Sequence, residues 1–336
     1  MEMTMLKLGW KAGPEQYPPK ELLEYAIAAE NAGFDSIDVS DHFHPWSESG
    51  QACFSWTWLG AAAVQTSKIV LGTGITCPIL RYHPAIIAQA SATLGVLAPD
   101  RAYLCVGTGE ALNEYAATGE WPGYEERQAM LIEAINLIRS LWTGQETTFE
   151  GIYYHTRKAK LYTKPEKPIP LYVSTMVPES STFAGRYGDG LITVGGGKPE
   201  TYKKILENFE AGAKEAGKDP SKMPRLIELN VAYTEDKDAA IKSMKEYWAG
   251  SFLPALFNQK IYTPRLAAKN GEAVGSDTME KMMCISSRPE DHVSYVRKYI
   301  DLGFDHFFYH YAGPNQKEFL EGYGRDVLPK IRKLSG

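Results

Sequence analysis

Short apolar runs alternate along the chain with longer stretches in which apolar residues recur every three or four positions. The short runs predict β-strands at residues 6–10, 36–40, 68–73, 102–109, 170–175, 191–197, 226–233 and 306–311. The amphipathic stretches predict helices at residues 19–32, 84–97, 128–142 and 318–333. Eight strands, most of them followed by a helix, predict an α/β fold of the (β/α)8 TIM-barrel type.

Two segments exceed the minimal barrel pattern. Residues 147–162 read TTFEGIYYHTRKAKLY and predict an inserted hairpin, whereas residues 245–289 are aromatic first and polar later, which predicts a lid or cover. The chain has no internal repeat, no low-complexity tract and no linker rich in Pro, Gly or Ser. We therefore expect a single domain over residues 1–336 that carries two insertions.

Composition narrows the class of protein. The 336 residues are 44% hydrophobic and 23% charged, with a formal net charge of −5, which disfavours a nucleic-acid partner. No run approaches 18 apolar residues and MEMTMLKLGW lacks a signal-peptide pattern, so neither a membrane nor secretion is expected. Cys53, Cys77, Cys105 and Cys284 are widely spaced, which is typical of reduced thiols in a cytoplasmic protein.

Candidate catalytic side chains follow the predicted strands, because barrel enzymes place their chemistry at the C-terminal ends of strands. His42 follows the second strand and titrates near neutrality, which favours a general base over a packing residue. Trp46, four residues later, either packs or lines the site. Glu110 follows a glycine turn after the fourth strand and is either a catalytic acid or a carboxylate at a helix N-terminus.

Two alternatives, a metal-dependent enzyme and a nicotinamide-dependent enzyme, have weaker support in the sequence. His42 and His44 have the spacing of a metal pair on one strand face, but the ends of strands four to six carry no histidine, so we predict no metal. The sequence GTGE (from Gly107) matches neither the Rossmann nor the P-loop pattern, which disfavours a nicotinamide enzyme.

Several motifs, in order along nearly the whole chain, carry a family resemblance. They are SDHFHPW (from Ser40), GITCPILRYHPAIIAQASATL (from Gly74), GVLAPDR (from Gly95), GTGEALNE (from Gly107), LYTKP (from Leu161), AGRYGDG (from Ala184) and EYWAG (from Glu246). With them the chain resembles the bacterial luciferase-like superfamily, in its branch of coenzyme F420-dependent dehydrogenases. The resemblance implies an oxidoreductase with coenzyme F420 as cofactor, and a homodimer.

The resemblance also implies roles for individual residues. His42 would take the proton of the substrate hydroxyl, Trp46 would position the reacting group, and Glu110 would act as acid or base toward the deazaflavin ring. A non-proline cis peptide bond of the family would fall on Gly74-Ile75. Cofactor contacts would fall on Asp41, Ile75, Cys77, Thr108, Gly109, Asn113, Met176, Val177, Glu179 and Ser180.

The same branch includes members that act on secondary alcohols and members that act on glucose 6-phosphate. The sugar-phosphate pattern has two lysines and an arginine, which align here with Lys198, Lys260 and Met282. Methionine cannot donate a hydrogen bond to phosphate, and WAGSFLPALFNQKIYTP (from Trp248) resembles the alcohol members. We expect a short secondary alcohol to be oxidised reversibly to a ketone, with substrate contacts at Val194, Lys198, Trp248 and Lys260.

Alternatives to this reaction stay open. Lys198 keeps a dehydrogenase of glucose 6-phosphate or another sugar 6-phosphate possible, and an FMN-dependent monooxygenase on the same barrel is a remoter alternative. Phe54, Trp56 and Trp58 lend weak support to the homodimer, since aromatic side chains are common in interfaces. The alternative for these three aromatics is that they fill the core under a loop.

Overall fold

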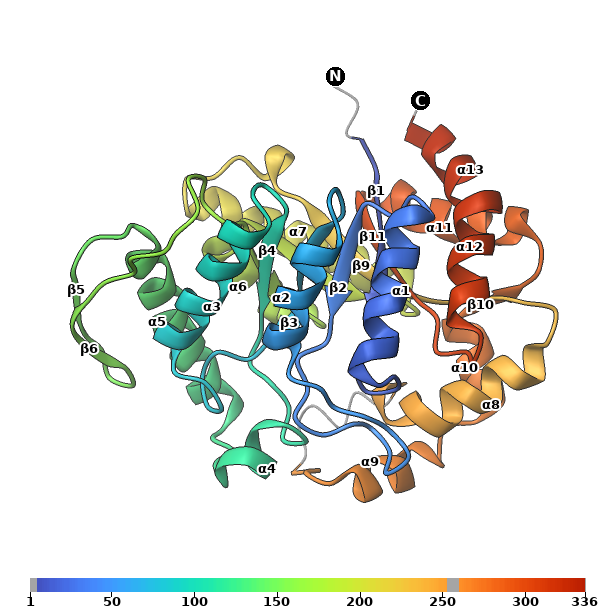
Figure 1. Ribbon diagram of the computed structural model, residues 1–336, viewed down its shortest axis with the longest axis horizontal. Coiled ribbons are helices and arrows are strands. Elements are labelled where there is room, and N and C mark those ends of the chain that lie inside the picture. The colour runs from blue at the N-terminus through green and yellow to red at the C-terminus, as the bar shows by residue number, and fades with distance from the viewer. Residues whose placement is uncertain (1–4, 253–259, 336) are drawn as a thin grey trace.

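Eight parallel strands form a closed barrel in the computed structural model, which describes residues 5–252 and 260–335 (Figure 1). The barrel closes because β9 pairs with both β8 and β11, and β11 pairs with β1. The predicted (β/α)8 barrel is confirmed. Its strands are β1 (Lys7–Ala12), β2 (Ser36–Val39), β3 (Val70–Thr76), β4 (Ala102–Val106), β7 (Leu171–Ser174), β8 (Gly190–Val194), β9 (Arg225–Tyr233) and β11 (His306–His310).

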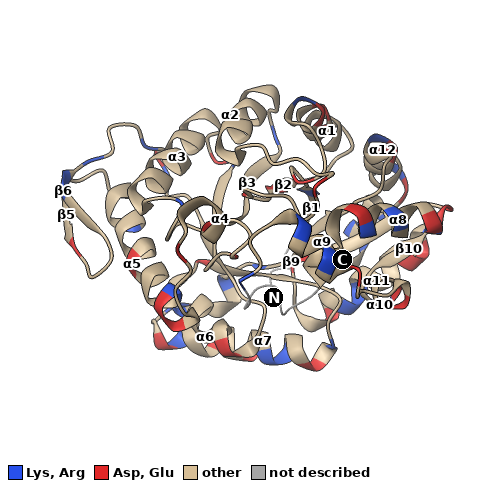
Figure 2. Ribbon diagram, turned by 90° about the horizontal axis from the view of Figure 1, so that it is seen from below, with Lys and Arg blue, Asp and Glu red and all other residues tan. Residues whose placement is uncertain are grey.

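Helices surround the strands, as the end-on view of Figure 2 shows. Lys and Arg are interspersed with Asp and Glu on these outer helices (Figure 2). The helices are α1 (Pro19–Asn31), α2 (Ser55–Gln65), α3 (Pro84–Leu97), α4 (Glu114–Thr118), α5 (Tyr124–Trp142), α6 (Pro178–Tyr187), α7 (Pro199–Glu215), α8 (Lys237–Trp248), α9 (Pro264–Gly271), α10 (Ser276–Met282), α11 (Pro289–Leu302), α12 (Gln316–Asp326) and α13 (Leu328–Arg332). None of the described helices is both long and apolar enough to cross a membrane.

Two helix predictions need correction, and one helix was missed. The helix expected at residues 128–142 begins earlier, at Tyr124. The closing helix expected at residues 318–333 is divided into α12 and α13, because Pro329 has no backbone N–H with which to continue α12. Helix α2 was not predicted, since SWTWLGAAAVQ is apolar on nearly every side and shows no helical period.

Both predicted insertions have regular structure where they are described. Strands β5 (Thr147–Glu150) and β6 (His155–Ala159) pair antiparallel, which confirms the hairpin. The second insertion holds the 3-10 helix η2 (Ala249–Phe252), helices α9 and α10, and β10 (Cys284–Ser286), which extends the sheet beside β9. Residues 253–259 of this insertion lie outside the described residues.

The second insertion has a hydrophobic cluster of its own. Trp248, Phe252 and Ile261 pack there together with Trp46 and Leu112, which come from the loops after β2 and β4. Because those loops lie at the C-terminal ends of the strands, the insertion covers part of that end of the barrel. This end is called the mouth below.

Polar side chains occupy both ends of the barrel interior, and an apolar layer lies between them. Residues two or four positions apart on a strand point to the same face, so Lys7 and Lys11 of β1 both face inward, at opposite ends. Glycine makes room for the apolar layer, because a Cβ on Gly9 would lie 2.5 Å from the Phe308 ring. The layer consists of Tyr103, Cys105, Ile192, Leu226 and Phe308.

Candidate active site

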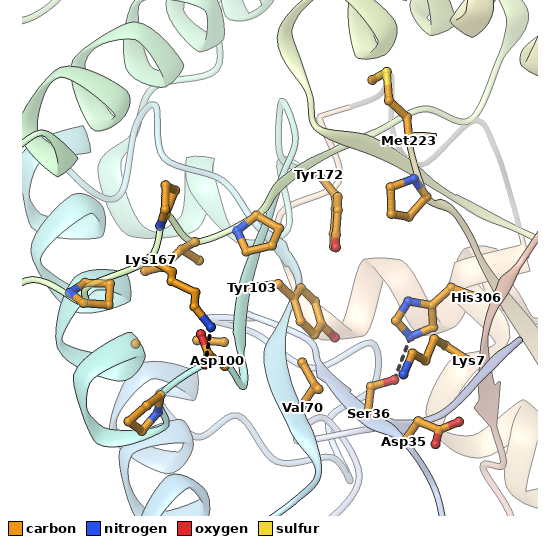
Figure 3. Close-up of a pocket in the computed structure, with 18 of the residues that line it drawn as sticks. Lys7, Asp35, Ser36, Val70, Asp100, Tyr103, Lys167, Tyr172, Met223 and His306 are labelled. Atoms are coloured by element: carbon orange, nitrogen blue, oxygen red, sulfur yellow. Dashed lines mark hydrogen bonds and ion pairs between the residues drawn. The ribbon is translucent and has the colours of Figure 1, made fainter. Parts of the chain in front are cut away.

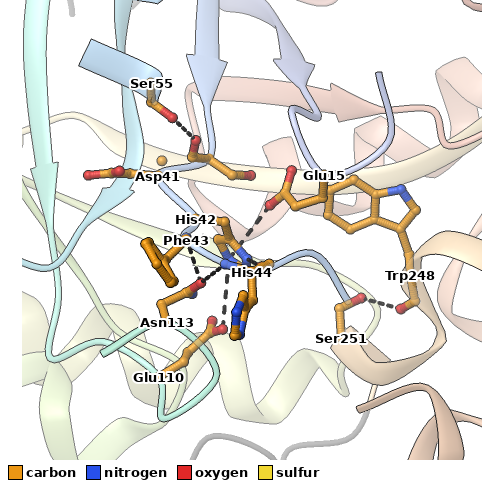
Figure 4. Close-up of polar contacts among 12 residues, drawn as sticks. Glu15, Asp41, His42, Phe43, His44, Ser55, Glu110, Asn113, Trp248 and Ser251 are labelled. Atoms are coloured by element: carbon orange, nitrogen blue, oxygen red, sulfur yellow. Dashed lines mark hydrogen bonds and ion pairs between the residues drawn. The ribbon is translucent and has the colours of Figure 1, made fainter. Parts of the chain in front are cut away.

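His42 lies at the centre of the mouth, on the loop that follows β2 (Figure 4). Its Nδ1 is 3.0 Å from the carbonyl oxygen of His44. A carbonyl only accepts, so Nδ1 carries the proton and Nε2 keeps a free lone pair. Burial lowers the pKa of His42 to about 3, so the imidazole is neutral at pH 7. The local structure thus prepares Nε2 as a proton acceptor.

Two carboxyl groups face this nitrogen from other strands. Nε2 of His42 is 3.6 Å from Oε1 of Glu15, after β1, and 3.7 Å from Oε2 of Glu110, after β4 (Figure 4). Burial, reinforced by other carboxylates nearby, raises the pKa of Glu15 to about 7 and of Glu110 to about 8. Within the described part of the chain, neither oxygen of Glu15 has a hydrogen-bond partner, and Oε2 of Glu110 has none. These unpaired atoms mark a place for a polar ligand.

A buried network of charges lies below His42. Nζ of Lys11 is 3.2 Å from Glu228 and 3.7 Å from Asp38, and Oε1 of Glu228 is 3.3 Å from Nδ1 of His310. Burial opposes ionisation of Glu228, but Lys11 and His310 outweigh it and lower the pKa of Glu228 to about 2. For Asp38, burial outweighs Lys11 and raises the pKa to about 7. The network places one firmly held positive charge, that of Lys11, beneath the site.

Two tryptophans wall the site. The ring of Trp46 lies 5.4 Å from that of His42, and the ring of Trp248 lies edge-on 4.3 Å from that of His310. Nε1 of Trp248 donates a 3.0 Å hydrogen bond to Gln16, next to Glu15. The second insertion therefore contributes directly to the wall, as expected for a cover.

Two of the expected cofactor residues shape the loop that carries His42. The Asp41 carboxylate accepts 2.8 Å hydrogen bonds from Thr76 and Tyr82. Oδ1 of Asn113 accepts from the backbone N–H groups of residues 43 and 44, at 2.9 and 3.1 Å. Both side chains thus have a positioning role within the protein, and direct contact with a cofactor stays a prediction for them.

Other expected cofactor residues form a close-packed turn at the ends of β3 and β4. Gly109 has a φ of +76°, and a Cβ there would lie 2.5 Å from Sγ of Cys77. A Cβ on Gly107 would lie 2.3 Å from Cδ1 of Ile75, and the peptide bond between Gly74 and Ile75 is cis, as expected. Thr108 is half-buried between the two glycines. Only glycine fits at these two positions, because Cys77 and Ile75 already fill the space that a Cβ would take.

The remaining cofactor candidates lie where β7 leads into α6. Met176 and Val177 are 43% and 47% exposed, and Glu179 is also exposed. Ser180 is buried, with its hydroxyl 2.6 Å from that of Thr175. The segment presents apolar side chains and the N-terminal amides of α6 to solvent, and such amides suit an anionic group.

The substrate candidates are split between two places. Val194 is half-buried at the end of β8, and Lys198 is exposed directly before α7. Met282 lies in the same neighbourhood, because a Cβ on Gly196 would be 3.0 Å from that of Met282. Lys260 is elsewhere, with Nζ 4.3 Å from the centre of the Tyr115 ring.

The structure adds residues that sequence reasoning missed. Glu15, Lys11, Asp38, Glu228 and His310 all surround the site, and none had been a candidate. For the strand residues among them, the signal was a charged residue inside an apolar strand, as in KLGWKA and LIELNVAY, whereas Glu15 lies outside the strands. Such residues are seldom fully buried unless they are paired or functional.

A metal site has no support from geometry. In the ranges 5–252 and 260–335, no group of three or more His, Cys, Asp or Glu side chains could hold a metal ion. Nδ1 of His42 is bonded to the backbone, and Nδ1 of His44 lies 3.3 Å from the carbonyl of Tyr262.

Comparison with known proteins places this geometry in a family. The profile of luciferase-like monooxygenases matches residues 3–306. The chain belongs to the luciferase-like family. An F420-dependent glucose-6-phosphate dehydrogenase of Mycolicibacterium gilvum is 43% identical over 99% of this chain and 100% of its own, and one of Mycolicibacterium smegmatis is 42% identical over the same shares.

A solved structure is similar at the level of the whole fold. An F420-dependent secondary alcohol dehydrogenase, in complex with an F420-acetone adduct, superposes with a TM-score of 0.93 at 39% identity, over 97% of this chain and 99% of that one. The expected branch of F420-dependent dehydrogenases is thereby confirmed. A type II Baeyer-Villiger monooxygenase with FMN, from Pseudomonas putida, is 18% identical, which shows the fold alone.

Proposed function

We propose that this protein is a coenzyme F420-dependent dehydrogenase that oxidises short secondary alcohols to ketones, reversibly. The supporting observation is a neutral His42 whose Nε2 lone pair faces two protonatable carboxyl groups in a walled site. That arrangement suits removal of the hydroxyl proton from oxygen in step with loss of a hydride from the carbon that bears this oxygen. Relatives at 39–43% identity are named as F420-dependent dehydrogenases.

The residues at the mouth fit a deazaflavin. Oε2 of Glu110 is buried without a hydrogen-bond partner among the described residues, and it follows the closely packed glycine turn of Gly107 and Gly109. Ile75 and Cys77 would lie behind the ring, and the start of α6 would receive the polar tail. When bound, F420 supplies a carbon that takes up the hydride.

The protein's own part in the reaction is proton transfer and exclusion of water. His42 accepts the hydroxyl proton at Nε2. Glu15, whose pKa is raised by burial to about 7, ionises readily 3.6 Å away and would stabilise the resulting imidazolium. Glu110 keeps its proton at pH 7, because burial raises its pKa to about 8, and donates a hydrogen bond toward the cofactor. Trp46 and Trp248 keep water out.

The substrate class follows from the anion-binding groups. Met282 stands beside the loop that precedes Lys198, where it offers no donor, and Lys260 lies over Tyr115. A phosphate dianion needs several charge-assisted hydrogen bonds to offset its desolvation. A small neutral alcohol needs none.

Sugar 6-phosphate oxidation is the second candidate. It is favoured by the names of the relatives at 39–43% identity. It is also favoured by Lys198, which is exposed at the N-terminal end of α7, where an anion is stabilised by the helix amides. Lys198 alone would supply one point charge to the phosphate.

A direct assay separates the two candidates. Purified protein is mixed with F420, and the absorbance of the oxidised cofactor is followed with isopropanol or with glucose 6-phosphate in the same buffer and salt. We expect a higher kcat/KM for isopropanol. A glucose 6-phosphate value about tenfold higher than that for isopropanol would reverse the assignment.

We also propose a homodimer in the cytoplasm. Of the three aromatics first considered, Trp56 and Trp58 are in the core and only Phe54 is exposed, at 52%. Better support comes from Val64 of α2 and Ile86 of α3, which are 64% and 55% exposed on neighbouring helices. The cysteines are all free thiols, as suits a reducing compartment. Light scattering at micromolar concentration would refute the dimer by giving the monomer mass.

A further inference from the structure

A large cavity lies at the end of the barrel opposite the mouth. It has a volume of about 1100 Å³ and is lined by the first residues of several strands, among them Lys7, Ser36 and His306 (Figure 3). On β1, Lys7 precedes Lys11 of the mouth by four residues, a rise of about 13 Å. The apolar layer that contains Phe308 and Tyr103 lies between the two ends. The cavity is therefore separate from the candidate active site.

The cavity has a buried polar wall. Oγ of Ser36 is 2.7 Å from Nε2 of His306, and the two residues are 1% and 9% exposed. Nδ1 of His306 has no hydrogen-bond partner among the described residues. Nδ1 is not among the fully buried atoms that lack a partner, so it is accessible from the cavity. If the Ser36 hydroxyl donates to Nε2, the proton of His306 is on Nδ1, available to an acceptor.

A cation stands beside this pair. Figure 3 shows the side chain of Lys7 next to Ser36 and His306. In the described ranges Lys7 forms no ion pair, whereas Lys167, across the cavity, is paired with Asp100 at 2.7 Å. Lys164 and Lys222 also line the cavity, but Lys7 is the lysine drawn beside the Ser36–His306 pair and has charge to offer there.

An aromatic and proline-rich surface completes the cavity. The rings of Tyr103 and Tyr172 lie 5.7 Å apart, and the Tyr172 hydroxyl has no hydrogen-bond partner among the described residues. The segment that leads into β7 contributes Pro165, Pro168 and Pro170 to the lining. Stiff flat surfaces of this kind favour a planar ligand, because little side-chain entropy is lost on binding.

We propose that this cavity is a second ligand site, specific for small aromatic monocarboxylates. Lys7 and the Nδ1–H of His306 bind the carboxylate, and the ring packs beside Tyr172. One negative charge is the limit, because Asp35 and Asp305 also line the cavity and would repel a dianion. Their oxygens accept from the backbone N–H groups of Leu8 and Arg225, so both stay in place.

The test uses 4-fluorobenzoate as the probe, observed by ¹⁹F NMR with the full-length protein at pH 7. We expect saturable binding with a Kd of about 1 mM. The uncharged 4-fluorobenzamide should bind about tenfold more weakly, because it lacks the charge-assisted contact with Lys7. A cavity that holds only water would give no saturation by the benzoate, and equal binding of the two probes would also overturn the proposal.

Variants locate the probe. Lys7→Gln should weaken benzoate binding about tenfold. Tyr172→Phe, which keeps the ring, and Lys68→Gln, an exposed lysine outside the cavity, should leave it nearly unchanged. Circular dichroism spectra of the variants establish that they are folded. Binding that survives Lys7→Gln would place the probe elsewhere and end the proposal. Addition of F420 should not displace the probe, so failure here and failure of the proposed dehydrogenase activity are distinguishable.

Discussion

The two ends of the barrel use the same strands for different chemistry. Strands β1, β2 and β11 each contribute one inward polar residue to each end. These residues are Lys11, Asp38 and His310 at the mouth, and Lys7, Ser36 and His306 at the opposite end. The two ends differ in whether their lysine has a carboxylate neighbour. At the mouth, Asp38 and Glu228 lie within 4 Å of Lys11, whereas the polar neighbours shown beside Lys7 at the opposite end are the neutral Ser36 and His306.

A lysine that is paired with carboxylates and a lysine that has none nearby can serve different purposes. At the mouth, Lys11 is neutralised by the protein itself, and burial, which Lys11 only partly offsets, keeps the pKa values of Glu15 and Glu110 raised. Such groups with shifted pKa values are suited to moving protons. At the opposite end Lys7 has no carboxylate partner among the described residues, so its charge is available to an anion from outside. Shared strand geometry therefore does not imply shared function.

The largest expected effect comes from removing the base at the mouth. His42→Ala should lower kcat by about 10²–10⁴, because a general base is lost, while F420 affinity stays nearly unchanged. Steady-state kinetics and a fluorescence titration with F420 measure the two quantities. His155→Ala, on the exposed side of β6, is the matched control and should have full activity. If His42→Ala retained most of its turnover, the mouth would lose its catalytic assignment.

A smaller effect is expected from placing a guanidinium group, which can donate two parallel hydrogen bonds to phosphate, at the mouth. Met282→Arg should raise kcat/KM for glucose 6-phosphate by about one to two decades, because a guanidinium beside the loop of Lys198 would bind phosphate. Met282→Leu controls for the loss of methionine and should give no gain. Assays at one ionic strength are required. An equal gain for both variants would show that charge at this position does not select the substrate.

The carboxyl groups of the mouth should make stability depend on pH above neutrality. Glu110 has its pKa raised from 4.5 to about 8, chiefly by burial, so the folded state keeps a proton that the unfolded chain has lost. The free energy of unfolding should therefore fall as pH rises from 6.5 to 8, by about 1–2 kcal/mol for this group. Urea unfolding of Glu110→Gln should show a flatter profile in this window. If the free energy of unfolding of Glu110→Gln depended on pH as steeply as that of the unsubstituted protein, the raised pKa of Glu110 would be excluded.

The opposite end should show the reverse dependence, with a smaller amplitude. Burial lowers the pKa of His306 from 6.5 to about 3, so below pH 6.5 the unfolded chain binds a proton that the folded state refuses. Stability should fall as pH decreases, and His306→Gln should remove about 1 kcal/mol of the loss between pH 6.5 and 5.5. His155→Gln is the control in the same urea titration. His42 contributes a parallel loss, so a residual slope is expected in His306→Gln.

Part of this comparison was accessible from the sequence. The strand runs, the hairpin at residues 147–162 and the helix at residues 84–97 were predicted from periodicity, and His42, Trp46 and Glu110 from their places after strands. Glu15 was not, because the residues after the first strand carry no distinguishing motif. Nor was the cavity at the opposite end, since Lys7 and Ser36 are ordinary at the start of a strand.

Local pattern determined the elements and with them the barrel, whereas the family came from the resemblance of the sequence motifs. Apolar alternation and prolines at helix starts act over a few residues, so they can be recognised from the sequence alone. Which charges meet depended on tertiary structure. Glu15, His42 and Glu110 come from three different strand ends, and the Ser36–His306 bond joins residues 270 apart in sequence. Barrel closure brings them together, and burial then decides their protonation, because desolvation depends on the whole surrounding fold.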